Sequence, residues 1–171
     1  YQYNLEGDNE TLLLEVEERL ERIDSIGNFL ILSSISVLGT DHIYSVNKQT
    51  GAIVDDLSLS FPVFGNSIKV EFSGQVAVDS SLRRIYFVSR NQGDSVYVRQ
   101  SANLDEAGNF QLNDISIEQS NNHHDLYHNE QADYVVSNFG ELYAKQDLSL
   151  ITTLKESIDG EEVNHAFVNL L

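Results

Sequence analysis

The sequence predicts an all-β protein built from short antiparallel strands. Residues 74–99 (GQVAVDSSLRRIYFVSRNQGDSVYVR) contain three runs in which apolar and polar residues alternate, separated by Asp, Ser, Asn and Gly. Val, Ile, Tyr and Phe, which favour strands, dominate each run, and the separating residues favour turns. The same pattern recurs from residue 25 to the end of the chain. We therefore expect strands joined by short turns throughout.

The lead-in, residues 1–24, permits two interpretations. Apolar residues between Leu13 and Ile23 follow helical spacing, and the Glu, Leu and Arg around them favour a helix. The same segment also alternates from Leu12 to Val16 as a strand would, and a second strand would then run over Leu20–Ile26. The β-rich sequence that follows favours the strand interpretation.

Four strands are expected between residues 25 and 73. They are Phe29–Ser34, His42–Asn47, Ala52–Leu59 and the run SIKVEF at 67–72. The second and third of these form a hairpin, in which Gly51 supplies the positive φ that such a turn requires. We expect Ser73–Gly74 to end SIKVEF as a turn.

The rest of the chain continues the pattern. The expected strands are VAVD, RIYFVS, SVYVR, Gly108–Ile117, Asp133–Asn138, Glu141–Lys145, Leu148–Leu154 and Val163–Leu170, with an irregularity at Asn113–Asp114. Ser120–Gln131 is polar and rich in His, and we expect it to be a loop. Glu156–Glu162 is expected to be an acidic turn.

A repeat of about fifty residues organises these strands. Tyr44, Tyr97 and Tyr143 each follow an apolar residue in a similar strand, at intervals of 53 and 46 residues. A four-stranded propeller blade occupies roughly 40–50 residues, and stacking such sheets buries their half-apolar faces. We therefore expect one domain over residues 1–171, with β-propeller-like antiparallel blades. It would have about four blades or be a fragment of a larger ring. A β-sandwich or barrel is the alternative.

Two segments resemble known blades. VAVDSSLRRIYFVS and HIYSVNKQTG resemble repeats of the β-propeller superfamily, including the YVTN-, NHL- and quinoprotein-type blades, and the resemblance covers about residues 19–155. SVNKQTGAIV is similar to the quinoprotein segment, but Asn47 stands where that pattern usually has Asp, and the chain contains no Trp. The departure argues against a quinone cofactor. The resemblance implies a fold, shared by proteins of many functions.

The charge disfavours two classes of partner. The formal net charge is −17, and residues 101–171 alone carry 13 acids against 2 bases. Nucleic-acid binding requires the opposite sign, and so does attraction to anionic membranes. No apolar run reaches the roughly 18–20 residues of a membrane helix, so we expect no membrane insertion. The chain contains no Cys and therefore no disulfide.

Two groups of residues have the chemistry of metal ligands. His123, His124, Asp125 and His128 combine imidazole and carboxylate ligands that would suit zinc. Asp105–Asn109 and Asp159–Glu162 are acidic, Gly-containing segments whose oxygens would suit calcium, although neither has the spacing of a dedicated calcium loop. A solvated loop and ordinary turns are the simpler interpretations of these segments.

No catalytic motif is present. The sequence lacks a Cys nucleophile, a Gly-x-Ser-x-Gly elbow and a glycine-rich phosphate loop. We expect a non-catalytic scaffold or binding module that recognises a protein or carbohydrate through its rim loops, outside the cytoplasm and beside the remainder of a larger propeller. One alternative is a metal-dependent propeller hydrolase or lactonase. Another is a calcium-stabilised structural domain of a surface protein.

Overall fold

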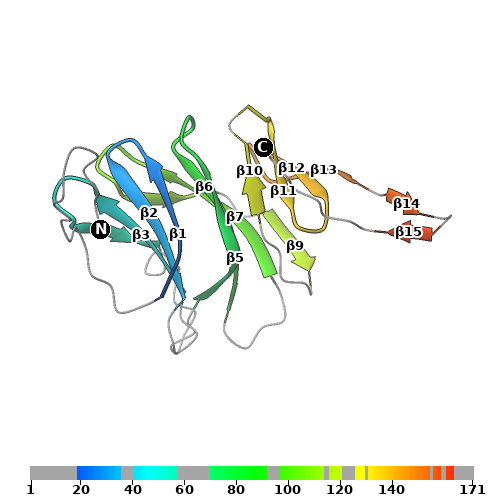
Figure 1. The fold of residues 1–171 in the computed structure, drawn as a ribbon, viewed down its shortest axis with the longest axis horizontal. Coiled ribbons are helices and arrows are strands. Elements are labelled where there is room, and N and C mark those ends of the chain that lie inside the picture. Colours follow the sequence, from blue (N-terminus) through cyan, green and yellow to red (C-terminus); the bar gives the residue numbers. More distant parts are fainter. Residues whose placement is uncertain are drawn as a thin grey trace, which may run out of the picture.

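The described residues form antiparallel β-sheets. The computed structural model describes residues 19–35, 41–57, 70–91, 97–113, 116–120, 126–129, 131–154, 156–158 and 161–163. Fifteen strands lie within these ranges, every strand pairing is antiparallel, and none of these residues is in an α-helix (Figure 1). The predicted all-β class is confirmed. None of the described sheets closes on itself, as a barrel would require.

The first sheet follows the order of the chain. It consists of β1 (Arg19–Ile26), β2 (Phe29–Ile35), β3 (Asp41–Asn47) and β4 (Ile53–Asp56). The strand interpretation of the lead-in is confirmed over Arg19–Ile26, whereas residues 1–18 lie outside the described ranges. The β3–β4 hairpin closes through Gly51, whose φ of 70° is the positive value expected from the sequence.

The second sheet has the same order. It consists of β5 (Val70–Asp79), β6 (Arg84–Asn91), β7 (Tyr97–Leu104) and β8 (Phe110–Leu112), and β9 (Ser116–Ser120) also pairs with β7. β8 and β9 share the strand expected over Gly108–Ile117, on either side of the irregularity expected at Asn113–Asp114. The fourth position of this sheet is therefore shared by two short strands.

The third sheet repeats the order once more. It consists of β10 (Leu126–His128), β11 (Tyr134–Ser137), β12 (Glu141–Ala144) and β13 (Leu150–Thr153). A separate hairpin follows, formed by β14 (Glu156–Ile158) and β15 (Glu161–Val163). No helix in the described part of the chain is long and apolar enough to cross a membrane.

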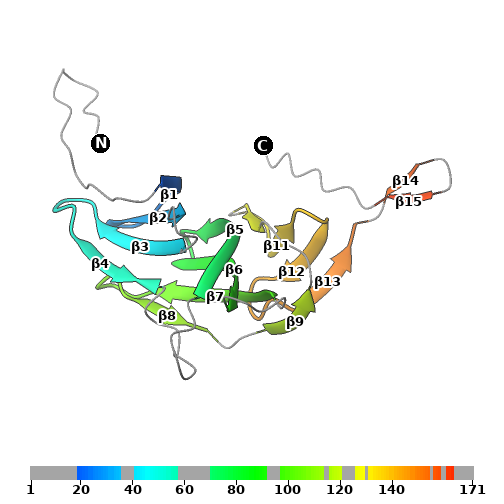
Figure 2. The same ribbon diagram turned by 90° about the horizontal axis from the view of Figure 1, so that it is seen from below.

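The three large sheets, of four, five and four strands, pack side by side in chain order (Figure 2). The first strands of neighbouring sheets contact each other, β1 against β5 and β5 against β10. An apolar cluster that includes Ile26, Ile43, Ile85 and Phe87 fills the space between the first two sheets. Alternate residues of the central strand β6 point to opposite faces, so Tyr86 and Val88 join a second cluster with the third sheet. Burial of these two clusters holds the three sheets together.

Three sequence predictions differ from the structure. Ser73–Gly74 is not a turn, because β5 continues through it and its register with β6 shifts between Ser73 and Ala77. A glycine inside a strand often accompanies such a bulge, since it packs no side chain. The expected loop Ser120–Gln131 contains β10, and the expected acidic turn Glu156–Glu162 contains β14 and the start of β15.

The repeated tyrosines are not structurally equivalent. Tyr44, Tyr97 and Tyr143 all lie on the third strand of their sheets. Tyr97 and Tyr143, however, point into the same cluster from facing sheets, whereas Tyr44 lies on the far face of the first sheet. A hydrogen-bonded turn follows each third strand, and the residue just before its first residue is Val46, Leu104 or Tyr143. These three residues are therefore the structurally equivalent ones. Sequence spacing identified the strand but not the register within it.

Candidate functional site

The carboxyl group of Asp79 lies at the centre of a buried polar cluster. Asp79 is the last residue of β5 and is fully buried. Its Oδ1 accepts hydrogen bonds from the Ser81 hydroxyl at 2.6 Å and from the Leu82 backbone N–H at 3.1 Å. An Asp that accepts from the backbone of its own turn is a common way to begin a tight turn. The local sequence therefore fixes one oxygen of Asp79.

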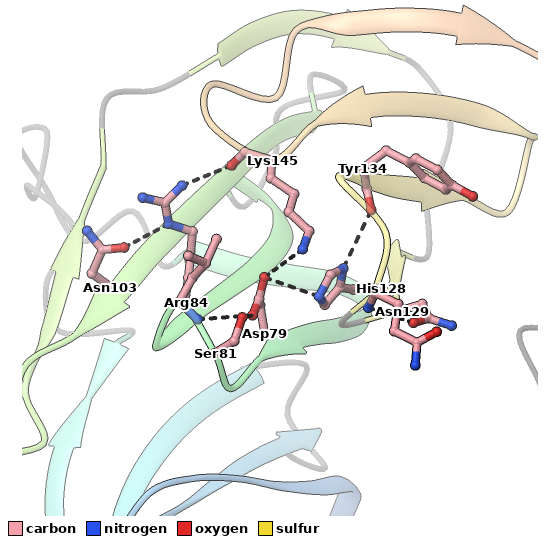
Figure 3. Close-up of polar contacts among 10 residues, drawn as sticks. Asp79, Ser81, Arg84, Asn103, His128, Asn129, Tyr134 and Lys145 are labelled. Atoms are coloured by element: carbon pink, nitrogen blue, oxygen red, sulfur yellow. Dashed lines mark hydrogen bonds and ion pairs between the residues drawn. The ribbon is translucent and has the colours of Figure 1, made fainter.

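The other oxygen faces two basic side chains from the third sheet. Lys145 Nζ lies 3.0 Å and His128 Nε2 lies 3.2 Å from Asp79 Oδ2 (Figure 3). His128 ends β10, and Lys145 directly follows β12. The His128 side chain has no exposed area and that of Lys145 is 7% exposed. The cluster therefore joins two neighbouring sheets in a space closed to solvent.

The surroundings keep Asp79 ionised. Burial, the largest single effect, raises the pKa of its carboxyl group. Hydrogen bonds from Ser81, Leu82 and Lys145, together with the charge of His128, outweigh that effect and lower the pKa from 3.8 to about 2. A carboxylate paired in this way satisfies the condition under which a buried charge is tolerated.

Arg84 ties the same two sheets together at the edge of the cluster. Its Nε donates to Asn103 Oδ1 at 2.8 Å within the second sheet, and its Nη1 donates to the Lys145 carbonyl at 2.9 Å (Figure 3). The guanidinium therefore holds the backbone from which Lys145 reaches Asp79. This contact positions the lysine rather than adding a further charge to the cluster.

A second polar link crosses the same two sheets. The Arg99 guanidinium, on β7, donates through Nη1 to the Tyr143 hydroxyl at 2.7 Å and lies over its ring, 4.1 Å from the centroid. The Tyr143 hydroxyl in turn donates to Glu141. Burial, followed by the hydrogen bond to Glu141, raises the pKa of Tyr143, so its phenol is neutral at physiological pH. The positive charge of Arg99 and the negative charge of Glu141 are thus linked by hydrogen bonds through the Tyr143 hydroxyl.

The Asp79 cluster does not have the arrangement of a nucleophilic catalyst. Ser81 donates to Asp79, so the carboxylate stands between the hydroxyl and the two basic side chains. A serine nucleophile requires a general base whose pKa lies near the working pH, and a carboxyl group with a pKa of about 2 accepts a proton poorly. The cluster is suited to holding two sheets in register.

Only part of the predicted metal site can be placed. The Nδ1 atom of His128 lies 3.5 Å from the Tyr134 carbonyl oxygen and its Nε2 faces Asp79, so both ring nitrogens point at protein oxygens. His123, His124 and Asp125 lie outside the described residues, and metal binding by the predicted group, His128 included, stays a prediction. Within the described ranges, no group of three or more His, Cys, Asp or Glu side chains could hold a metal ion.

The predicted calcium segments are described only in part. Asp105 accepts hydrogen bonds from the backbone and the side chain of Asn109, which lower the pKa of its carboxyl group and close the β7–β8 turn. Asp159 and Gly160 lie outside the described residues. The Asp105 carboxylate therefore has a structural task in its turn, and calcium binding stays a prediction for both segments.

Sequence reasoning missed Asp79 and Lys145. The run VAVD indicated a strand that ends in an Asp turn, and this is one half of the role of Asp79. No local pattern connects that turn with Lys145, because the contact depends on how the second and third sheets pack. Lys145 is one of only two bases among residues 101–171, and a base in so acidic a segment was the available signal.

The fold and the buried polar cluster place the protein among all-β proteins that are built from successive antiparallel sheets. The chain forms successive four-stranded antiparallel sheets, joined by apolar clusters and by a buried Asp–Lys–His group. Comparison with protein families, with curated proteins and with solved structures found no significant match to the chain.

Proposed function

We propose that this chain is a non-catalytic, β-propeller-like scaffold that presents a binding surface on one rim. The observation that carries the proposal is the threefold succession of four-stranded sheets whose first strands contact one another. Radial stacking of such sheets is the arrangement of propeller blades, and the remainder of a larger propeller would continue it. The buried clusters serve this scaffold, so a ligand would be recognised on the loops.

The rim is made of the turns that join first to second and third to fourth strands. We call residues 27–28, 48–52, 80–83, 105–109 and 145–149, which form five of these turns, the hairpin rim. Its backbone is held by side chains within sheets, as where Lys48 Nζ donates to the Gly27 carbonyl at 2.6 Å. It is also held between sheets, as where Ser45 donates to the Gly108 carbonyl. A surface fixed in this way loses little entropy when it binds a ligand.

The exposed side chains of the hairpin rim suit a polar ligand. Gln49, Glu106 and Gln146 each lie in the turn between the third and fourth strands of their own sheet, and all three are exposed. Amides offer both donors and acceptors, and carboxylates accept, so these groups match the hydroxyls of a carbohydrate. A polar protein surface is the other class of ligand that they would fit.

Binding of labelled protein to a glycan microarray and to a peptide array tests the proposal. We expect binding on at least one array, and a loss of at least tenfold for the triple variant Gln49→Ala, Glu106→Ala, Gln146→Ala. Ile23→Ala is the control, since Ile23 is 59% exposed on β1, outside the hairpin rim. Absence of binding on both arrays, or unchanged binding by the triple variant, would contradict the proposal.

Catalysis is tested separately. The unmodified chain is incubated with a panel of lactones in the presence of zinc or calcium, and hydrolysis is followed by proton release. The proposal expects no turnover above the metal alone. Protein-dependent turnover would contradict the non-catalytic assignment and favour a metal-dependent hydrolase.

A further inference from the structure

The outer edge of the third sheet is a strand that is paired on one side within the described residues. β13 ends the order β10-β11-β12-β13, and no strand in the described part of the chain pairs with its outer side (Figure 2). Such an edge presents backbone N–H and C=O groups to any strand that approaches. Natural proteins usually blunt it with charges, with Pro, with β-bulges or with short strands, or they cover it with another segment.

β13 is only four residues long and its register with β12 shifts beside Ile151, but it has no charge and no Pro. Leu150, Ile151 and Leu154 are 46%, 56% and 54% exposed. Residues 148–154 (LSLITTL) contain no charged residue and no Pro. The corresponding strands of the other two sheets differ, because β4 carries Asp55 and Asp56, and β8 buries Phe110 in the apolar cluster. Among the outer strands β4, β8 and β13, only β13 combines several exposed apolar side chains with the absence of a charged residue, since the exposed Ile53 of β4 is followed by Asp55 and Asp56.

The hydrogen-bond pattern shows which backbone groups point outward. The Leu154 N–H donates to the Gly140 carbonyl at 2.8 Å, on the β12 side of the strand. Hydrogen-bonded and non-bonded positions alternate along an antiparallel pair. Thr153, the neighbour of Leu154 and the partner of Glu141 in the register, therefore directs its own N–H and C=O away from β12.

We propose that β13 binds an extended cationic peptide segment of another protein as an added strand. Strand addition satisfies the outward backbone groups, and alternate apolar side chains of the peptide cover Ile151 and Leu154. Charge selects the partner, because this chain carries −17; beside β13 in the sequence lie two acids, Asp147 and Glu156, and one base, Lys155. A second copy would bring a further −17, and repulsion disfavours that pairing. The proposal does not depend on the function of the hairpin rim.

Fluorescence anisotropy with a designed probe tests strand addition. The probe is a fluorescein-labelled peptide, Lys-Val-Lys-Val-Thr-Val-Lys-Val-Lys, titrated with the full chain at 150 mM NaCl. We expect saturable binding, and no binding of the counterpart in which every Lys is Glu. Failure of the cationic peptide to bind, or equal binding of the acidic one, would overturn the proposal.

Two variants separate strand addition from simple charge attraction. Ile151→Asp adds a negative charge, so it would strengthen purely electrostatic binding, but it should weaken strand addition at least tenfold. Thr153→Pro removes an outward N–H and should weaken binding to a similar extent. Ile53→Asp is the matched control, because Ile53 is 45% exposed on the outer strand β4. Circular dichroism checks that each variant is folded.

The results have clear consequences. Weakened binding by Ile151→Asp and Thr153→Pro, with unchanged binding by Ile53→Asp, supports the proposal. Stronger binding by Ile151→Asp, or equal losses at Ile151 and Ile53, overturns it in favour of non-specific attraction. Concentration-dependent dimerisation in sedimentation that Thr153→Pro abolishes, without any peptide binding, overturns it in favour of a second copy.

Discussion

Replacing Asp79 by Asn should destabilise the protein by about 3 kcal/mol. The change keeps the shape of the side chain and an oxygen that can accept from Ser81 and Leu82. It removes the negative charge that pairs with Lys145 at 3.0 Å and faces the His128 ring at 3.2 Å, in a space with almost no solvent. Removing one partner of a buried pair costs about 3–5 kcal/mol, because it leaves an uncompensated charge.

The reverse change, Lys145→Met, should cost less. Asp79 would keep Ser81, the Leu82 N–H and His128 as partners, so we expect a loss of about 2 kcal/mol. The double variant Asp79→Asn, Lys145→Met leaves no unpaired carboxylate or ammonium. It should cost about 3 kcal/mol rather than the 5 kcal/mol of two independent changes, which is a coupling energy of about 2 kcal/mol.

Urea unfolding at pH 7 measures these values. Far-ultraviolet circular dichroism and tyrosine fluorescence follow the transition, since the chain has 8 Tyr and no Trp. Asp147→Asn is the control, because Asp147 is exposed and accepts only from its own turn, through Ser149. It should change stability by less than about 1 kcal/mol. Additive losses at Asp79 and Lys145, within about 0.5 kcal/mol, would refute the assignment of the two groups as one buried pair.

Three further changes test other parts of the structure. Acid should destabilise the wild type more than it destabilises the Asp79→Asn variant. The pKa of the Asp79 carboxyl group is about 2 in the native state, below its unfolded value of 3.8. This difference contributes about 2 kcal/mol of stability, which is present above pH 4 and is lost as the pH falls towards 2. Equal acid dependence in urea unfolding would contradict this. Gly108→Ala should lower the free energy of unfolding by about 3 kcal/mol, because the φ of Gly108 is +95° and an added Cβ would lie 2.4 Å from Phe29 Cε1. An unchanged melting temperature would contradict this prediction. Asp55→Ala should lower the free energy of unfolding by about 1–2 kcal/mol, because it removes the carboxylate that accepts from the Phe110 N–H at 2.7 Å. Asp55→Asn keeps an accepting oxygen and should recover part of that loss. Equal melting temperatures for the two variants would argue against this hydrogen bond.

Sequence patterns located most strands because strand signals are local. Alternation, β-branched residues and turn residues act over four to eight positions, and they predicted β2, β3, β6 and β11 closely. The errors fell where a local signal has two physical causes. Gly74 supports either a turn or a bulge, and pairing with β6 decided for the bulge. The polar segment around Leu126 concealed β10, which is only three residues long.

The site was less predictable than the strands. The sequence indicated His128 through its neighbours His123 and His124, as a metal ligand. Its ring in the structure faces Asp79 and the Tyr134 carbonyl, two oxygens that come from a different sheet and a later strand. Chemistry that depends on two sheets meeting leaves no spacing pattern in a single segment.

The sequence by itself determined that the chain is all-β, acidic and built from short hairpins, because propensity and charge belong to individual residues. Its repeat also predicted units of four antiparallel strands, and the sheets confirm these. Only the tertiary structure decided that Asp79 receives Lys145 and His128, and that Leu150, Ile151 and Leu154 at the edge of the third sheet are exposed. Those features depend on which faces meet, and the packing energy that selects the faces is shared among residues far apart in the chain.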